Sequence, residues 1–329
     1  SMATYRQVKG YSIKSVSSNP DNSNVGQVWY NSSTKAITSK LSIPASWASG
    51  GNLGTARSAL AGCGTQTAGL GFGGNAPPPS NNPVGLTEEY NGSTWSEQND
   101  LNTARLGMGG AGTQTAGLAF GGRLAAPPTT FKDETEEYNG TSWSEQNDLA
   151  TARINLAGCG TQTAGLGFGG EASTGAVGVT EEYDGGSWTE SGDLGTSRFA
   201  LAAAGTQTAA VGFGGYISGA SALTEEYNGS SWTASNNMGT ARYALAGSGT
   251  QTAALAFGGS PGNVATTEQY DGTSWTTTTS MTTGRRQLGS ANASPSTASL
   301  AFGGATPSAS NATEEFTGLS EPVRTFDVS

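Results

Sequence analysis

Short apolar runs and polar turns alternate along most of this chain with a regular period. One unit consists of an arginine, a run of small apolar residues, Gly-Thr-Gln-Thr-Ala, an apolar run ending in Phe-Gly-Gly, a loop, Thr-Glu-Glu-Tyr, Asn-Gly and a tryptophan. The glycine pair returns six times, at 73–74, 121–122, 169–170, 214–215, 258–259 and 303–304. A fixed period of about 20–50 residues is the signature of a repeat architecture.

Each unit predicts four short strands. In the first repeat we expect an inner strand at 58–62, where small residues suit a crowded axis, and a second strand at Ala68–Phe72. The second run is apolar on both sides, which is typical of a strand buried between neighbouring sheets. A third strand should end at Tyr90, and Asn91-Gly92 predicts a tight type I′ hairpin before the strand that carries the tryptophan. Such a unit cannot bury both faces alone, so the units should stack as blades around an axis.

The order of the motifs predicts how the ring closes. Trp47 stands before the first arginine, whereas Glu314-Glu315-Phe316 of the sixth repeat has no tryptophan after it. The N-terminal strand at 41–49 should therefore complete the last blade. The expected fold is an all-β, six-bladed propeller at 41–329, with four antiparallel strands per blade and an N-terminal extension or hairpin at 1–40. The segment 28–34 mimics the third-strand hairpin, which keeps a seventh blade open as an alternative.

Two resemblances to known families bear on the function. The glycine pair, tyrosine and tryptophan in register resemble the kelch repeat over residues 47–316, and this resemblance implies a kelch-type β-propeller. The run Gly-Gln-Val-Trp-Tyr-Asn at 26–31 is similar to short segments of bacteriophage tail and structural proteins. This second resemblance implies a virion component.

Charge and cysteine content narrow the choice of partners. The net charge of −10 and the pI of about 4.5 disfavour a nucleic-acid partner, which needs a basic surface. The chain has no apolar run long enough for a transmembrane helix, so we expect no membrane insertion. Cys63 and Cys159 occupy equivalent positions two repeats apart, too distant for a disulfide, and should be buried thiols.

Histidine is absent, and with it the commonest general base and transition-metal ligand. Galactose oxidase, a kelch enzyme, holds its copper with histidines, so this chain cannot reproduce that site. We therefore expect no enzyme activity, no metal and no cofactor. A carbohydrate-active enzyme of sialidase or lyase type is kept as an alternative.

One arginine and one glutamate pair recur in each repeat and predict structural ion pairs between blades. The arginines are Arg57, Arg105, Arg153, Arg198, Arg242 and Arg285. The glutamates assigned to these inter-blade contacts are Glu89, Glu137, Glu182 and Glu226, although alternation along the strand leaves open which member of each pair meets an arginine. A ring of arginines that binds anions is the alternative.

The loop between the second and third strands varies most between repeats, and variable insertions on one face often mark the binding side. Its two longest copies, 75–86 and 123–134, carry Pro77-Pro78-Pro79 and Pro127-Pro128. The contact candidates are Arg123, Phe131, Lys132 and Tyr216.

The sequence therefore predicts a non-catalytic binding or structural module. We expect a phage-type tail appendage that adheres to a glycan or a surface protein through these loops, located in the virion and with other virion proteins as further partners. An intracellular kelch adaptor in the cytoplasm is another alternative.

Overall fold

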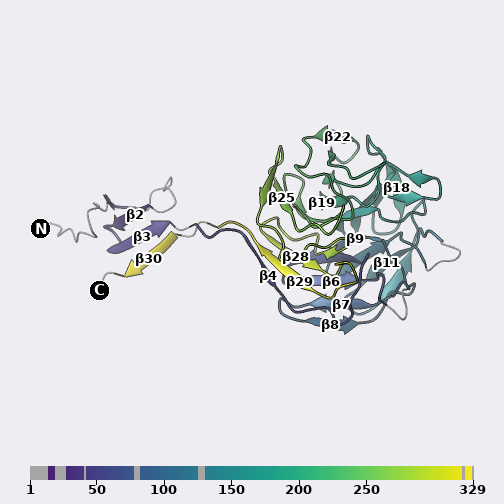
Figure 1. The fold of residues 1–329 in the computed structure, drawn as a ribbon, viewed down its shortest axis with the longest axis horizontal. Coiled ribbons are helices and arrows are strands. Elements are labelled where there is room, and N and C mark those ends of the chain that lie inside the picture. Colours follow the sequence, from purple (N-terminus) through teal and green to yellow (C-terminus); the bar gives the residue numbers. More distant parts are fainter. Residues whose placement is uncertain are drawn as a thin grey trace, which may run out of the picture. The chain divides into compact units, whose positions relative to one another are not determined.

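The computed structural model describes residues 14–18, 27–40, 42–77, 82–124, 130–320 and 323–327, and for Lys14 and 323–327 only the backbone. This part of the chain contains strands and no helix (Figure 1). It divides into two compact units, one of residues 46–317 and one that combines 1–45 with 318–329. Four prolines of the two longest variable loops lie outside the described residues: Pro78, Pro79, Pro127 and Pro128.

The larger unit contains six four-stranded antiparallel sheets, numbered here along the chain. The first sheet contains β5 (Ala61–Thr65), β6 (Ala68–Phe72), β7 (Thr87–Tyr90) and β8 (Trp95–Gln98). The second contains β9 (Gly109–Thr113), β10 (Ala116–Phe120), β11 (Thr135–Tyr138) and β12 (Trp143–Gln146). The third contains β13 (Ala157–Thr161), β14 (Ala164–Phe168), β17 (Thr180–Tyr183) and β18 (Trp188–Ser191), with a small hairpin of β15 (Glu171–Ala172) and β16 (Gly175–Ala176) in its loop.

The other three sheets repeat this order. The fourth contains β19 (Ala202–Thr206), β20 (Ala209–Phe213), β21 (Thr224–Tyr227) and β22 (Trp232–Ser235). The fifth contains β23 (Ala246–Thr250), β24 (Ala253–Phe257), β25 (Thr267–Tyr270) and β26 (Trp275–Thr278). The sixth contains β27 (Gly289–Ser290), β28 (Ala298–Phe302), β29 (Thr313–Thr317) and β4 (Ser46–Ser49). The sheets therefore form a propeller-like repeat fold.

The fourth strand of the sixth sheet comes from the N-terminal side of the unit. In β4, Trp47 lies opposite Phe316 of β29, and its indole N–H donates to Thr267 Oγ1 of the fifth sheet at 3.1 Å. The Trp47 ring lies 5.1 Å from Phe257 and 5.1 Å from Phe316 between centroids. Segments more than 200 residues apart in sequence are thus joined in one sheet and one aromatic cluster.

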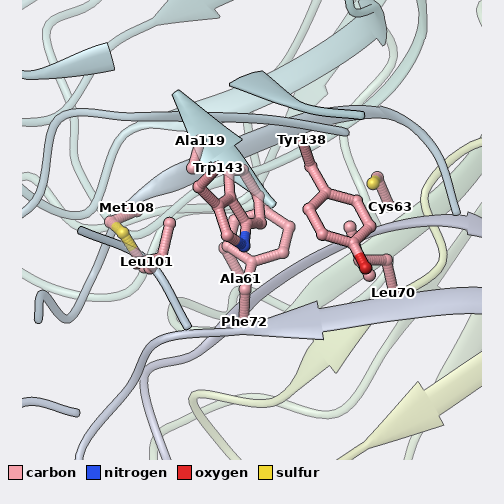
Figure 2. Packing of buried hydrophobic residues seen from close by; sticks show 9 residues of the cluster. All are labelled: Ala61, Cys63, Leu70, Phe72, Leu101, Met108, Ala119, Tyr138 and Trp143. Carbon is pink, nitrogen blue, oxygen red and sulfur yellow. The ribbon is translucent and has the colours of Figure 1, made fainter. Parts of the chain in front are cut away.

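The core lies between neighbouring sheets. Figure 2 shows Phe72 of the first sheet against Trp143 of the second, with Tyr138 beside it; the Phe72 and Trp143 centroids are 5.0 Å apart. Leu70 and Phe72 on one face of β6 are fully buried, and Gly69 and Gly71 on the other face are buried too, as the apolar run predicts for a strand covered on both faces. The two thiols, Cys63 and Cys159, are free and buried, which confirms the prediction for them.

Two local predictions are wrong. The inner strand of the first sheet begins at Ala61, three residues after the predicted start, because Ala59 has a φ of 52° and breaks the extended backbone. The turn after β7 is not type I′, since only Gly92 of the Asn91-Gly92 pair has a positive φ. Instead, Asn91 Oδ1 accepts the backbone N–H groups of Ser93 and Thr94, and these residues make a four-residue connection.

The smaller unit contains one sheet, in the order β1 (Lys14–Val16), β2 (Val28–Asn31), β3 (Ala36–Lys40) and β30 (Val323–Asp327). The β2–β3 hairpin contains the whole of the predicted segment at 28–34. This sheet is not a seventh copy of the repeat unit, because β1 pairs parallel to β2. Residues 323–327 were predicted to belong to the propeller at 41–329, but they pair with β3 of the smaller unit instead.

Candidate ligand-binding mouth

The recurrent arginines, which precede the first strand of each sheet, form ion pairs within their own repeats. Each is fully buried, and each donates to a glutamate of its own repeat at 2.5–2.9 Å. The pairs are Arg57–Glu88, Arg105–Glu136, Arg153–Glu181, Arg198–Glu225, Arg242–Glu268 and Arg285–Glu314. This corrects the expectation of ion pairs between blades. The first carboxylate of each pair points inward and reaches its own arginine, whereas the second points to the opposite side of the strand.

Each of these arginines is also held by the backbone. Arg153 Nη1 donates to the carbonyls of Gly169 at 2.8 Å and Val179 at 2.6 Å, while Glu181 Oε2 accepts the N–H of Ala150 at 2.6 Å. Burial lowers the pKa of the Arg153 guanidinium, and the Glu181 charge opposes that shift. An arginine enclosed in this way cannot contact a ligand, so the six arginines do not form an anion-binding ring.

The second glutamates join neighbouring sheets through tyrosine hydroxyls. Tyr138 donates to Glu89 at 3.1 Å and Tyr183 to Glu137 at 3.0 Å. The same bond recurs as Tyr227–Glu182, Tyr270–Glu226 and Tyr90–Glu315. The four predicted inter-blade glutamates therefore do bridge repeats, with tyrosine rather than arginine as the partner. At the remaining junction both members change together, to Gln269 and Phe316.

Two further side chains join neighbouring sheets, the tryptophan in all six repeats and the glutamine in five. The six tryptophan indoles donate to a threonine of the preceding sheet, as Trp143 does to Thr87 at 2.9 Å. The glutamine of each Gly-Thr-Gln-Thr-Ala turn donates to two backbone carbonyls of the preceding sheet, as Gln114 does to Gly69 and Tyr90. These turns are structural contacts between repeats.

A ring of backbone hydrogen bonds surrounds the axis, two residues after each arginine. The N–H of each ring residue donates to the carbonyl of the ring residue in the preceding repeat at 2.7–2.8 Å, and the series returns to its start. Its members are Ala59, Gly107, Asn155, Ala200, Ala244 and Gln287. All six have a positive φ of 52–65°. Since this conformation costs an L-residue about 1–2 kcal/mol, the ring holds five non-glycine residues in a strained backbone.

These ring residues border a cavity of about 230 Å³. Its walls contain Leu60, Leu156, Leu201, Leu245 and Leu288, one leucine from each of five repeats, with Met108 in the sixth position. None of the residues that line it carries a charge. Below it, Asn292 of the sixth sheet reaches the second and third sheets, where its Nδ2 donates to the carbonyls of Gly110 at 2.7 Å and Gly158 at 3.2 Å. We call this depression the mouth.

One side of the mouth is aromatic. Phe199 and Tyr243 line the cavity from neighbouring repeats, and Tyr216 packs between them, with centroid distances of 5.3 Å to Phe199 and 5.1 Å to Tyr243. All three rings are partly exposed. Tyr216 was predicted as a contact residue, but its partners were not, because Phe199 and Tyr243 follow the arginine at a position that reads as the start of the inner strand.

The variable loops lie against the mouth. The residue before each ring residue pairs by backbone hydrogen bonds with the first loop residue after the glycine pair, as Phe199 does with Tyr216 and Leu106 with Arg123. Arg123 also pairs with Phe131 across its own loop. Lys132 forms an ion pair with Glu134, which occupies its ammonium. Three of the four predicted contact residues thus lie together in the second repeat, and Tyr216 lies in the fourth.

Comparisons with known proteins supply no identity. Neither a search against protein-family models nor one against curated proteins found a match to this chain. Among the residues that the structure describes, no group of three or more histidine, cysteine, aspartate or glutamate side chains could hold a metal ion. No helix that could cross a membrane occurs in the described ranges.

Proposed function

We propose that this chain is a six-bladed kelch-type β-propeller that acts as a non-catalytic binding module. The observation that carries this proposal is where the repeats agree and where they differ. Arginine, tryptophan and the first glutamate recur in all six repeats and are occupied in contacts within a repeat or between sheets. The residues that precede the ring residues all differ: Ser58, Leu106, Ile154, Phe199, Tyr243 and Arg286.

Several series of contacts support a closed ring of six blades. The ring of backbone hydrogen bonds returns to Ala59 through Gln287. The tryptophan–threonine bonds also complete a circuit, with Trp95 donating to Thr313 and Trp47 to Thr267. The inner strands contact one another in sequence, and β27 contacts β5. A closed ring brings all the variable loops to one face, around one mouth.

The cellular setting of the proposal rests on the sequence. The tryptophan-tyrosine-asparagine segment, which forms β2, resembles phage structural proteins, and the acidic chain has few lysines. We propose a phage-type particle component that adheres to a glycan or a surface protein through the variable-loop face.

A loop replacement tests the binding face. The loop at 123–134 is shortened to the seven residues of 260–266, and the exposed Glu145→Ala change on β12 of the same repeat serves as the control. Binding is measured on a printed glycan array and on immobilised bacterial cells. We expect the shortened loop to weaken binding and Glu145→Ala to leave it unchanged. Equal binding by all three proteins would reject this face.

A further inference from the structure

The residues on one side of the mouth differ in kind from those on the other side, and this difference indicates a class of ligand. Its aromatic side, formed by Phe199 and Tyr243 of the fourth and fifth repeats, is flanked by the amides of Asn155 in the third repeat and Gln287 in the sixth. The two remaining repeats present Ala59 and Gly107, which add almost no side chain. The space therefore has an aromatic side with an amide at each end. Its rings are inclined to one another, at 42° between Phe199 and Tyr216 and 75° between Tyr216 and Tyr243.

The amides are available to a ligand. Among the residues that the structure describes, neither the Asn155 nor the Gln287 side chain hydrogen-bonds to another protein group, whereas their backbone N–H groups are fixed by the ring. Gln287 is exposed and Asn155 partly so. An amide offers two donors and an acceptor with two lone pairs, so it can bind hydroxyl groups in either direction.

The absence of charge from the cavity lining disfavours recognition of a carboxylate or an ammonium group inside it, because no opposite charge compensates its desolvation. The volume of about 230 Å³ is below the roughly 300–1,000 Å³ of pockets that enclose drug-sized molecules, so a small group fits. A sugar ring combines an apolar C–H face with hydroxyl groups at its edge. The apolar C–H face can pack against an exposed aromatic ring, and the hydroxyl groups can hydrogen-bond to the amides.

We propose that the mouth binds one neutral sugar ring, with Phe199 and Tyr243 against its apolar face and Asn155 and Gln287 at its hydroxyl groups. This inference rests on the proposed binding function and names its ligand class. Tyr216 is a positioning residue, because it packs against both rings. The ring of backbone hydrogen bonds fixes the backbone of Asn155 and Gln287 along the rim, which limits part of the entropy lost on binding.

The test is calorimetric titration of the full chain with the methyl glycosides of glucose, galactose, mannose and N-acetylglucosamine. At least one should bind, and Phe199→Ala and Tyr243→Ala should each lower its affinity by about tenfold or more. Tyr243→Phe keeps the ring and should change affinity by less than about twofold. Ser58→Ala is the matched control at the same rim position in the first repeat, and it should also have no effect. Thermal unfolding of each variant verifies that it is folded.

Three outcomes would overturn the inference. They are no binding of any neutral glycoside, equal binding by Tyr243→Ala and wild type, and binding of a short apolar peptide at the mouth in place of a sugar. If an apolar peptide binds at the mouth, the proposed binding function stands and only the ligand class is wrong. The same holds if a charged glycan binds and shortening the 123–134 loop abolishes that binding. The proposed function itself fails if the loop replacement leaves binding to cells and glycans unchanged.

Discussion

The loss of stability on replacing a charged residue of this chain depends on whether that residue is buried. The Arg285 side chain is fully buried and pairs with Glu314 at 2.9 Å, whereas its neighbour Arg286 is partly exposed and forms no described ion pair. The sequence predicted that such pairs exist, from one arginine and two glutamates per repeat. It could not show which carboxylate is used, because the sense of the alternation depends on which face of the strand points inward.

Replacing Arg285 with alanine should therefore destabilise the larger unit far more than replacing Arg286. Removing one partner of a buried ion pair leaves an uncompensated charge, at a cost of about 3–5 kcal/mol. An exposed arginine costs within about 0.5 kcal/mol. Urea unfolding of Arg285→Ala and Arg286→Ala measures both, and similar midpoints for the two variants would contradict a structural role for the ion pair.

The tyrosine–glutamate bonds give the protein a dependence on alkaline pH. Burial, together with the glutamate that each hydroxyl contacts, raises the pKa of Tyr90, Tyr227 and Tyr270 to about 12 from 10.0. A raised pKa favours the neutral form in the folded state. The contribution is therefore fully present below pH 10 and is lost as the pH rises toward 12.

Stability measured by urea unfolding should thus fall between pH 10 and 12, and the fall should be smaller in Tyr227→Phe. Phenylalanine already occupies the equivalent place at Phe316. That variant is expected to be less stable than wild type near neutral pH, because Glu182 loses its donor. A Tyr227→Phe curve parallel to that of wild type would show that this tyrosine does not contribute to the pH dependence.

At the scale of elements, the strands that follow an apolar pattern were predictable and the irregular segments were not. β6 occupies the predicted residues, Ala68–Phe72, because both of its faces are buried. β5 starts later than predicted because nothing in the sequence indicates that Ala59 has a positive φ. The mouth was missed for the same reason. The one visible signal was Gly107, which stands where the other repeats have larger residues.

The strand β4 should be necessary for the larger unit even though it is short. A chain truncated to begin at Gly50 loses Trp47, which contacts Phe257 and Phe316 and bonds to Thr267. Truncation of a buried tryptophan side chain alone costs about 3–5 kcal/mol. A chain that begins at residue 42 and ends at 320 retains β4 and serves as the control. We expect thermal unfolding and limited proteolysis to show marked destabilisation of the first chain only.

In the whole molecule, each of the six described junctions between sheets has a ring bond and a tryptophan–threonine bond, and all but the junction of the fifth and sixth sheets also have a tyrosine–glutamate bond. The ring bond from Ala59 to Gln287 has the same length as the bond from Gly107 to Ala59, 2.8 Å, although its residues are much farther apart in sequence. A closed ring in which every junction has these two bonds can have its chain ends at more than one place. The proposed fold then does not require the chain ends of the larger unit to lie between β29 and β4.

A circular permutant tests this equivalence. The chain ends are moved to the turn between Tyr90 and Trp95, and Phe316 is joined to Trp47 by Asn-Gly-Ser-Thr, the native connection at 91–94. The graft is geometrically matched because Phe316 lies opposite Trp47 as Tyr90 lies opposite Trp95. Chain ends at exposed turns are generally tolerated. We expect a folded protein with a single thermal transition near that of the 42–320 chain. A control permutant opened between Ala200 and Leu201 interrupts the backbone ring and should unfold at a lower temperature. Equal melting temperatures for the two permutants, or an unfolded first permutant, would contradict a closed ring of six blades.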